Sequence, residues 1–144
     1  MAITTNAIAN SFKKELLEGK HDFTASTGSA FKLAMYNSNA VLGASTTSYT
    51  TGSEVTSPAG YTAGGKALVN TGTSVSSSVA ITTFGNLSFT NVTLTARGAL
   101  IYNTSNSNSA VAVLDFVSDK TATAGTFTIQ FPAYTTSAAI LRIS

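Results

Sequence analysis

The amino-acid sequence predicts a mainly β protein: a β-sandwich or a jelly-roll-like barrel with one N-terminal amphipathic helix. Three observations predict this class. Short apolar runs recur along the chain, many alternating with Thr or Ser; turn residues separate them at a spacing of roughly 8–12 residues; and only one segment has helical periodicity. A length of 144 residues suits one domain. We expect an N-terminal arm and helix over residues 1–22 and a β domain over residues 23–144.

The helix is predicted over residues 5–19. Ile8, Phe12 and Leu16 recur every four residues, which places them on one face of a helix. The Thr and Asn side chains just before this stripe can cap the first turn, and Gly19 can adopt the left-handed conformation that ends a helix.

The first half of the β domain has fewer strand signals than the second. In the segment 30–36, Phe31, Leu33 and Met35 alternate with Lys32, Ala34 and Tyr36, as in a strand with two different faces. Residues 37–65 contain mainly Ser, Thr and Gly between scattered apolar residues, so we expect long loops there. Further strands are predicted over residues 66–69 and 75–83.

The second half of the chain is more regular. The pair Arg97-Gly98 interrupts a strand-like region and predicts a bulge or bend. Residues 103–109 form a polar loop, residues 118–125 a turn, and Pro132 ends the strand before it. The strands of this half are predicted over residues 87–89, 92–96, 99–102, 110–117, 126–131 and 138–143.

The composition argues against catalysis and against several classes of ligand. There is no Cys, only one His, and only 10% of the residues are charged. We therefore expect no catalytic residues, no cofactor and no metal site. A formal net charge of +2 is too small to predict binding to nucleic acid or to an anionic membrane. The first ten residues lack the pattern of a secretory signal.

One motif imitates a nucleotide-binding loop. The segment Gly60–Ala67 matches a P-loop except at its last position, where Ala67 replaces the Ser or Thr that binds Mg²⁺. A short β-like run follows it, whereas a P-loop opens a helix. We therefore interpret the segment as a glycine-rich turn before a strand.

The remaining polar candidates also favour structural roles. His21 lies beside Asp22, but no second His and no nucleophile motif accompany them, so we expect a surface or capping histidine. Asp115, Asp119 and Glu54 have no spacing typical of a Ca²⁺ loop. We expect Asp115 to face outward or to pair with a basic residue.

Five residues are the candidates for contact with a partner: Ile3, Ile8, Phe12, Leu16 and Arg97. The apolar stripe of the helix either covers the open end of its own sandwich or docks on a neighbouring subunit, and the uncharged arm before it is the second part of such an attachment. Arg97 has two equal interpretations. Its guanidinium can bind a carboxylate across an interface, or it can pair with Asp115 in the same chain.

Several segments together carry a resemblance that covers most of the chain. They are Asn10–Phe23, Phe31–Tyr36, Gly60–Gly65, Thr95–Asn103, Ala110–Phe116, Ser118–Ala122 and Phe127–Pro132. In this order they resemble small virion proteins of tailed bacteriophages. The resemblance brings no catalytic residues with it.

The resemblance implies a non-enzymatic structural protein of the virion. Its size and its β-rich composition favour a head decoration (cement) protein on the outer surface of the head. Its partners would be the major capsid protein and other copies of itself, in a homotrimer. Two alternatives stay open: a tail-associated receptor- or glycan-binding module, which would expose aromatic side chains, and a neck or tail-tube subunit. Host and copy number do not follow from the sequence.

Overall fold

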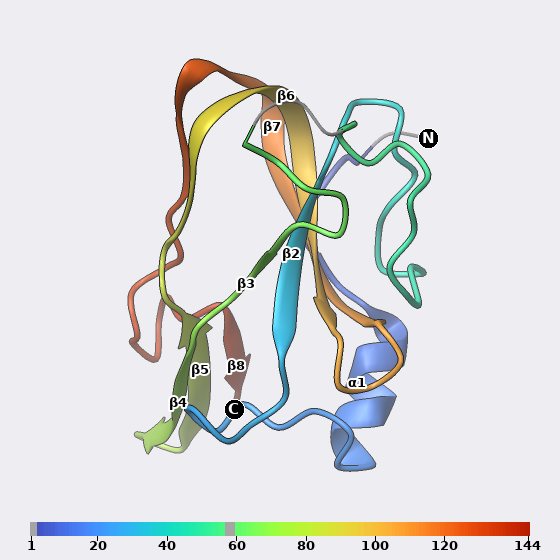
Figure 1. Cartoon of the computed structure of the whole chain (residues 1–144). Helices are drawn as coiled ribbons and strands as arrows, with labels where there is room; N and C mark the ends of the chain where they lie inside the picture. Colours follow the sequence, from blue (N-terminus) through green and yellow to red (C-terminus); the bar gives the residue numbers. More distant parts are fainter. Residues whose placement is uncertain (1–2, 57–59) are drawn as a thin grey trace.

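The computed structural model describes residues 3–56 and 60–144 and confirms the predicted class. Strands account for 47% of the chain and helix for 6%, and two antiparallel sheets form a β-sandwich-like fold (Figure 1). The five-stranded sheet has the order β1-β7-β6-β2-β3 and the three-stranded sheet the order β4-β5-β8. Their bounds are β1 Ala7–Ile8, β2 Phe31–Tyr36, β3 Lys66–Ala67, β4 Asn70–Ser76, β5 Val79–Phe84, β6 Leu87–Asn103, β7 Ser109–Ile129 and β8 Leu141–Ile143, and the helix α1 spans Asn10–Leu17.

The two longest strands, β6 and β7, form one antiparallel ribbon that contributes to both layers. Beside β2 the ribbon has one register shift, between Ile101 and Tyr102, and Gly98 pairs with Asp115. The pairing then shifts between Ala96 and Gly98, and the ribbon turns over and descends on the opposite side of the molecule (Figure 1). The predicted irregularity at Arg97-Gly98 is confirmed, since such a shift bends the strand that carries it.

The predicted turn over residues 118–125 is wrong. Lys120, Thr121 and Ala122 pair with β6, so β7 continues through this region. Val117 and Ala124 have positive φ angles of 70° and 44°. The polar residues therefore belong to bulges in a bent strand and not to a turn between two strands.

The predicted single strand over residues 75–83 is also wrong, because a hairpin occupies it. Its turn is Ser77-Ser78, and both residues have positive φ angles, of 49° and 67°. A two-residue turn of this kind matches the twist of the flanking strands. Asn-Gly or Asp-Gly is the usual sequence there, so two serines gave no turn signal.

The N-terminal helix is shorter than predicted. Residues Ala7 and Ile8 pair with Val113 and Ala112 of β7 and are therefore extended, and no side chain caps the helix at Ala9. The predicted role of Gly19 is confirmed by its φ of 71°. The pairing with β7 ties the N-terminal segment to the five-stranded sheet.

The core lies between the layers and contains the apolar residues that alternate in the sequence. Phe31, Leu33 and Met35 are buried, as are Ala34 and Tyr36 on the opposite face of β2. The second face is buried because the chain after β2 returns over it: the Val55 N–H donates to the Met35 carbonyl, and Glu54 bridges to Tyr36. A strand covered on both faces loses its simple alternation.

Candidate functional site: a groove between the two sheets

One side of the sandwich is open. On this side β1 ends the five-stranded sheet and β8 ends the three-stranded sheet, and neither pairs with another strand on its outer edge among residues 3–56 and 60–144. A series of connected hollows runs between these two edges and along α1. We call this feature the interlayer groove.

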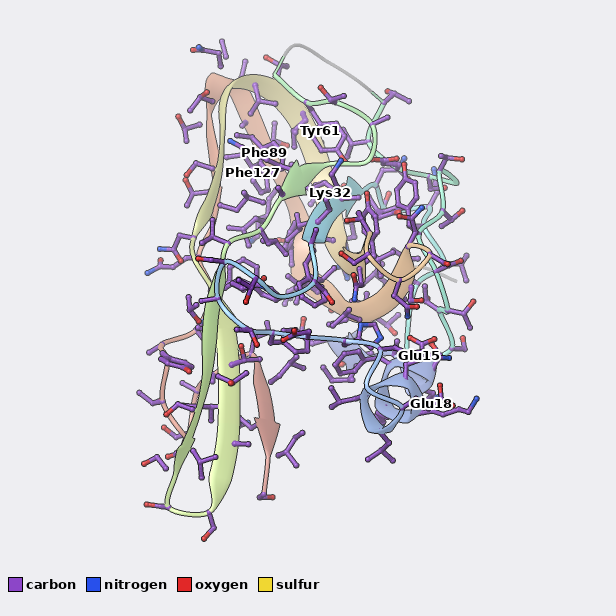
Figure 2. All side chains as sticks on the ribbon, turned by 60° about the horizontal axis from the view of Figure 1, so that its bottom comes forward. Glu15, Glu18, Lys32, Tyr61, Phe89 and Phe127 are labelled. Atoms are coloured by element: carbon purple, nitrogen blue, oxygen red, sulfur yellow. The ribbon has the colours of Figure 1, made fainter. Side chains whose placement is uncertain are left out.

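One end of the interlayer groove lies under the bent ribbon of β6 and β7. This hollow has a volume of about 760 Å³. Its apolar lining comes mainly from β7 and the segment that follows it: Leu114, Phe116, Phe127, Ile129, Phe131 and Ile140. Phe127 stands opposite Phe89 of β6, and both lie far from Glu15 of α1 and from Glu18, which follows the helix (Figure 2).

The other end of the groove lies between α1 and β8 and has a volume of about 720 Å³. Its walls include Ile8 and Leu16 on one side and Leu141 and Ile143 on the other. A smaller hollow of about 310 Å³ joins the two ends, and Ile140 lines all three. The groove is therefore continuous along the open side.

The groove exposes large apolar side chains to solvent at its helical end. Leu17 is 92% exposed and Ile143 is 57% exposed. Single exposed apolar residues are common on proteins, but a continuous apolar strip typically marks a binding surface. The hydrophobic effect therefore favours covering this side of the molecule.

The charged side chains that line these three hollows are all basic: Lys120 at the ribbon end, and Lys13 and Arg142 at the helical end. None of the three is in an ion pair among the described residues. Lys120 Nζ donates to Ser118 Oγ, and Arg142 donates to the carbonyls of Thr136 and Ser137. The groove thus combines an apolar floor with a positively charged rim.

The candidate contact residues separate into two groups. Ile8 and Leu16 line the groove and are only partly buried. Ile3 is 0% exposed, and its side chain packs close to Gly98 of β6. Phe12 is buried as well, against His21 and Phe23. Only the first group is available to a partner while the fold is intact.

Arg97 lies in an ion pair with Asp115 of the same chain. Of its two predicted roles, the structure therefore shows the pairing with Asp115. The Val117 N–H donates to Asp115 Oδ1 at 2.8 Å. This hydrogen bond and the Arg97 guanidinium hold the pKa of Asp115 below its ordinary value. The pair fixes the two strands where the ribbon bends.

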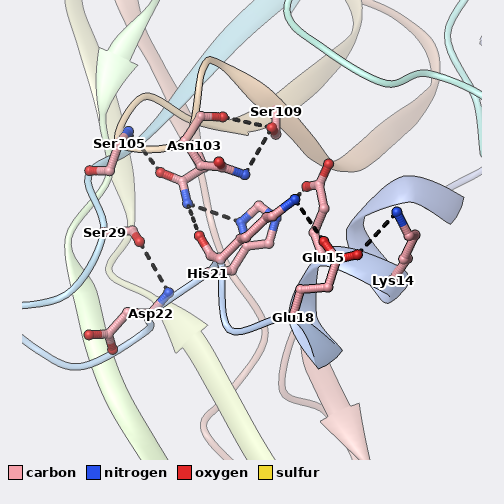
Figure 3. A network of polar contacts seen from close by, with 11 residues as sticks. Lys14, Glu15, Glu18, His21, Asp22, Ser29, Asn103, Ser105 and Ser109 are labelled. Carbon is pink, nitrogen blue, oxygen red and sulfur yellow. Dashed lines mark hydrogen bonds and ion pairs between the residues drawn. The ribbon is translucent and has the colours of Figure 1, made fainter.

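His21 is buried, which corrects the expected surface position. Its Nε2 lies 2.7 Å from a carboxylate oxygen of Glu15, and Asn103 Nδ2 donates to its Nδ1 at 3.0 Å (Figure 3). The Ser105 N–H donates to Asn103 Oδ1 and so orients the amide. The Asp22 carboxylate accepts hydrogen bonds from the N–H and hydroxyl of Thr24 and not from the His21 ring. Both ring nitrogens are occupied by structural partners.

A second buried polar cluster surrounds Glu54, beside Tyr36 of β2. This is the closed side of the sandwich, where β3 pairs with β2 and the chain continues into β4. The carboxylate accepts hydrogen bonds from the hydroxyls of Tyr49 and Tyr61 and from the Gly64 N–H, at 2.6 to 2.7 Å. Burial raises the pKa of Tyr61, and its hydrogen bond to Glu54 raises it further. Burial likewise raises the pKa of Tyr36, whose hydroxyl donates to the Thr50 carbonyl. The cluster fastens the segment after β2 to the sheet.

The segment that imitates a P-loop has a structural role in the same region. A Cβ on Gly65, whose φ is +77°, would lie 1.8 Å from the carbonyl oxygen of Leu33. Lys66 Nζ donates to the Ser88 carbonyl and lies 5.7 Å from the centre of the Phe89 ring. The lysine is therefore engaged by β6, and the glycine permits close contact with β2.

Sequence reasoning missed Glu54 as the centre of a buried cluster and the β8 wall of the groove. Glu54 stands in a Ser- and Thr-rich segment without a motif, so only its pairing with distant tyrosines reveals it. Among residues 3–56 and 60–144, no group of three or more His, Cys, Asp or Glu side chains is arranged to hold a metal ion. In the same part of the chain, no helix has the length and apolar character needed to cross a membrane.

Comparison of the chain with protein-family models, with curated proteins and with solved structures gives no match.

Proposed function

We propose that the protein is a non-enzymatic structural protein of a tailed-bacteriophage virion: a decoration or cement protein that binds major capsid subunits on the outer surface of the head. The observation that carries the proposal is the interlayer groove, a series of adjoining hollows with a mainly apolar lining. Such a surface suits a protein whose activity is binding.

The proposed mechanism is the burial of surface against the shell. A stable contact buries roughly 1,200–2,000 Å² in total, and this area must be exposed again before the capsid subunits separate. Copies repeated over a lattice hold one another at a high effective concentration, so modest single contacts are sufficient. The low content of charged residues, 10% of the chain, suits a protein packed against many neighbours.

The absence of catalysis is part of the proposal. It is supported by the engagement of the titratable side chains, since His21, Glu54 and Lys66 all have internal hydrogen-bond partners. The glycan-binding alternative is less well supported. Tyr49, Tyr61 and Tyr102 donate their hydroxyls to partners within the chain, and they form no exposed aromatic platform.

Self-association into a homotrimer also stays a proposal. It would use a face other than the interlayer groove, which we assign to the capsid. Light scattering of the purified protein separates a trimer from a monomer.

The test of the proposed function is the number of copies in purified particles of the phage that carries this chain. Quantitative mass spectrometry, calibrated on the major capsid protein, should give hundreds of copies per particle. A single ring of copies would instead indicate a neck or tail subunit, and particles without the chain would overturn the virion assignment.

A further inference from the structure

The outer edges of β1 and β8 border the groove, and within residues 3–56 and 60–144 no further strand pairs with them. Backbone N–H and C=O groups at an unpaired strand edge form hydrogen bonds with any added strand of suitable sequence. Because these edges belong to the two different sheets, a guest in extended conformation can pair with one of them while its side chains reach the apolar floor. A helix in the groove would leave both edges without partners.

The charges of the groove specify the guest further. In a strand, successive side chains point to opposite faces. A guest strand would therefore direct every second residue to the apolar floor and the others to the rim, where Lys13, Lys120 and Arg142 lie. Carboxylates at those alternate positions would complement the rim.

The chain itself offers no matching acidic surface. Glu18 and Asp115 are in ion pairs with residues of the same chain. Glu15 is hydrogen-bonded to His21, and Glu54 is buried among tyrosines. The Asp22 carboxylate is hydrogen-bonded to Thr24. Asp119 is then the one remaining acidic side chain among the described residues. A symmetric contact between two grooves would bring like charges together, because both copies would present the same patch. The partner is therefore a different polypeptide.

We propose that the interlayer groove binds an extended segment of a different protein, in which apolar residues alternate with Asp or Glu, by adding it as a strand at the open side of the sandwich. This inference rests on the proposed function in one respect: in the virion, the segment would belong to the capsid subunit. The groove chemistry stands without that assignment.

The test is a binding titration with a labelled peptide of about eight residues, the order of a strand's length, in which Val alternates with Glu. Fluorescence anisotropy should show saturable binding by the full-length protein. Peptides that alternate Val with Lys, or Ser with Glu, should bind at least roughly tenfold more weakly, because the first repels the rim and the second has no apolar face.

Variants of two exposed lysines locate the peptide. Lys13→Glu and Lys120→Glu alter opposite ends of the groove, and each should weaken binding of the Val-Glu peptide roughly tenfold, since a rim attraction becomes a repulsion. Lys14→Glu is the matched control, since Lys14 follows Lys13 on the helix but is absent from the groove lining. It should leave the affinity within about twofold of the parent.

Backbone pairing has its own readout. Two versions of the Val-Glu peptide, N-methylated either at every Val or at every Glu, each block the N–H groups of one strand edge. One version should lose binding and the other should retain it, because only one edge of the guest pairs with the sheet. Three results would each overturn the proposal. The two N-methylated peptides could bind equally well, or the Val-Glu peptide could bind no better than the Val-Lys peptide. Alternatively, Lys13→Glu and Lys120→Glu could leave the affinity for the Val-Glu peptide unchanged.

The peptide-binding test and the particle-composition test can fail independently of each other. Particles that contain the chain, together with a protein that ignores the Val-Glu peptide, would refute the inference and leave the virion assignment standing. Peptide binding with particles that lack the chain would do the reverse.

Discussion

The two sides of the sandwich are built differently. On the closed side the chain itself crosses from one sheet to the other: β3 pairs with β2, and only Leu68 and Val69 separate it from β4. Leu68 is buried there, and the Glu54 cluster fastens the preceding loop. On the open side, β1 and β8 end their sheets, and neither pairs with a further strand in the described chain.

This difference shows how one fold can separate stability from binding. Polar groups on the closed side are satisfied internally, so changes there should alter the free energy of unfolding. The interlayer groove contributes apolar surface that stays in water, so changes there should alter binding far more than folding.

Replacing Gly65 by Ala should cost about 3 kcal/mol or more, because the new Cβ meets the Leu33 carbonyl and the residue requires a positive φ. Urea unfolding measures the loss. Gly43→Ala is the matched control, since no atom lies within 4 Å of its added Cβ. A Gly65→Ala protein as stable as the control would mean that the closed side is not tightly packed.

Replacing Glu54 by Ala should destabilise the protein by about 2–4 kcal/mol, because the Tyr49, Tyr61 and Gly64 donors lose their acceptor. Glu54→Gln should cost less than about 1 kcal/mol. Its Oε1 still accepts from Tyr61 and Gly64, and its Nε2 can donate to the Tyr49 hydroxyl oxygen. Equal losses for both variants in urea unfolding would show that the hydrogen bonds are not the cause.

Alkaline pH should destabilise the protein through the same cluster. Burial raises the folded-state pKa of Tyr36 and Tyr61 above the ordinary value of about 10, so the unfolded chain loses these protons first. Their contribution is complete below pH ~10 and should decline above it by about 1.4 kcal/mol per pH unit for each tyrosine. Urea midpoints between pH 8 and 11 measure the decline. Tyr61→Phe should make it shallower, and an unchanged slope would contradict this origin.

The smallest effect on stability is expected in the groove. Leu17→Ser and Ile143→Ser should each change the free energy of unfolding by less than about 0.5 kcal/mol, because both side chains are largely exposed. Leu68→Ser on the closed side provides the contrast and should cost about 2–5 kcal/mol, as for other buried truncations. A large loss for the groove variants would assign this surface to the core.

The sequence was sufficient for the fold class and for much of the core, because alternating apolar residues such as Phe31, Leu33 and Met35 report burial directly. It was insufficient for the course of β7. Polar residues 118–125 have the composition of a turn, but pairing with β6 keeps them extended. Such long-range pairing is not encoded in local propensity.

The candidate site was predicted in part. Ile8 and Leu16 belong to the apolar stripe of the N-terminal segment, and both line the groove. Leu141 and Ile143 could not be assigned to it, because the sequence does not say which strand ends a sheet. Ile3 was assigned to an arm without internal contacts, yet its side chain packs beside Gly98, where the absent Cβ leaves room.

The most direct test of the account measures stability and particle occupancy on the same pair of variants. Ile143→Glu places a charge in the interlayer groove, and Val41→Glu places one at a somewhat more exposed site that lines none of the groove hollows. We expect similar melting temperatures for both, full occupancy of phage heads by Val41→Glu, and occupancy reduced roughly tenfold for Ile143→Glu. Full occupancy by Ile143→Glu would contradict the assignment of the groove as the attachment surface.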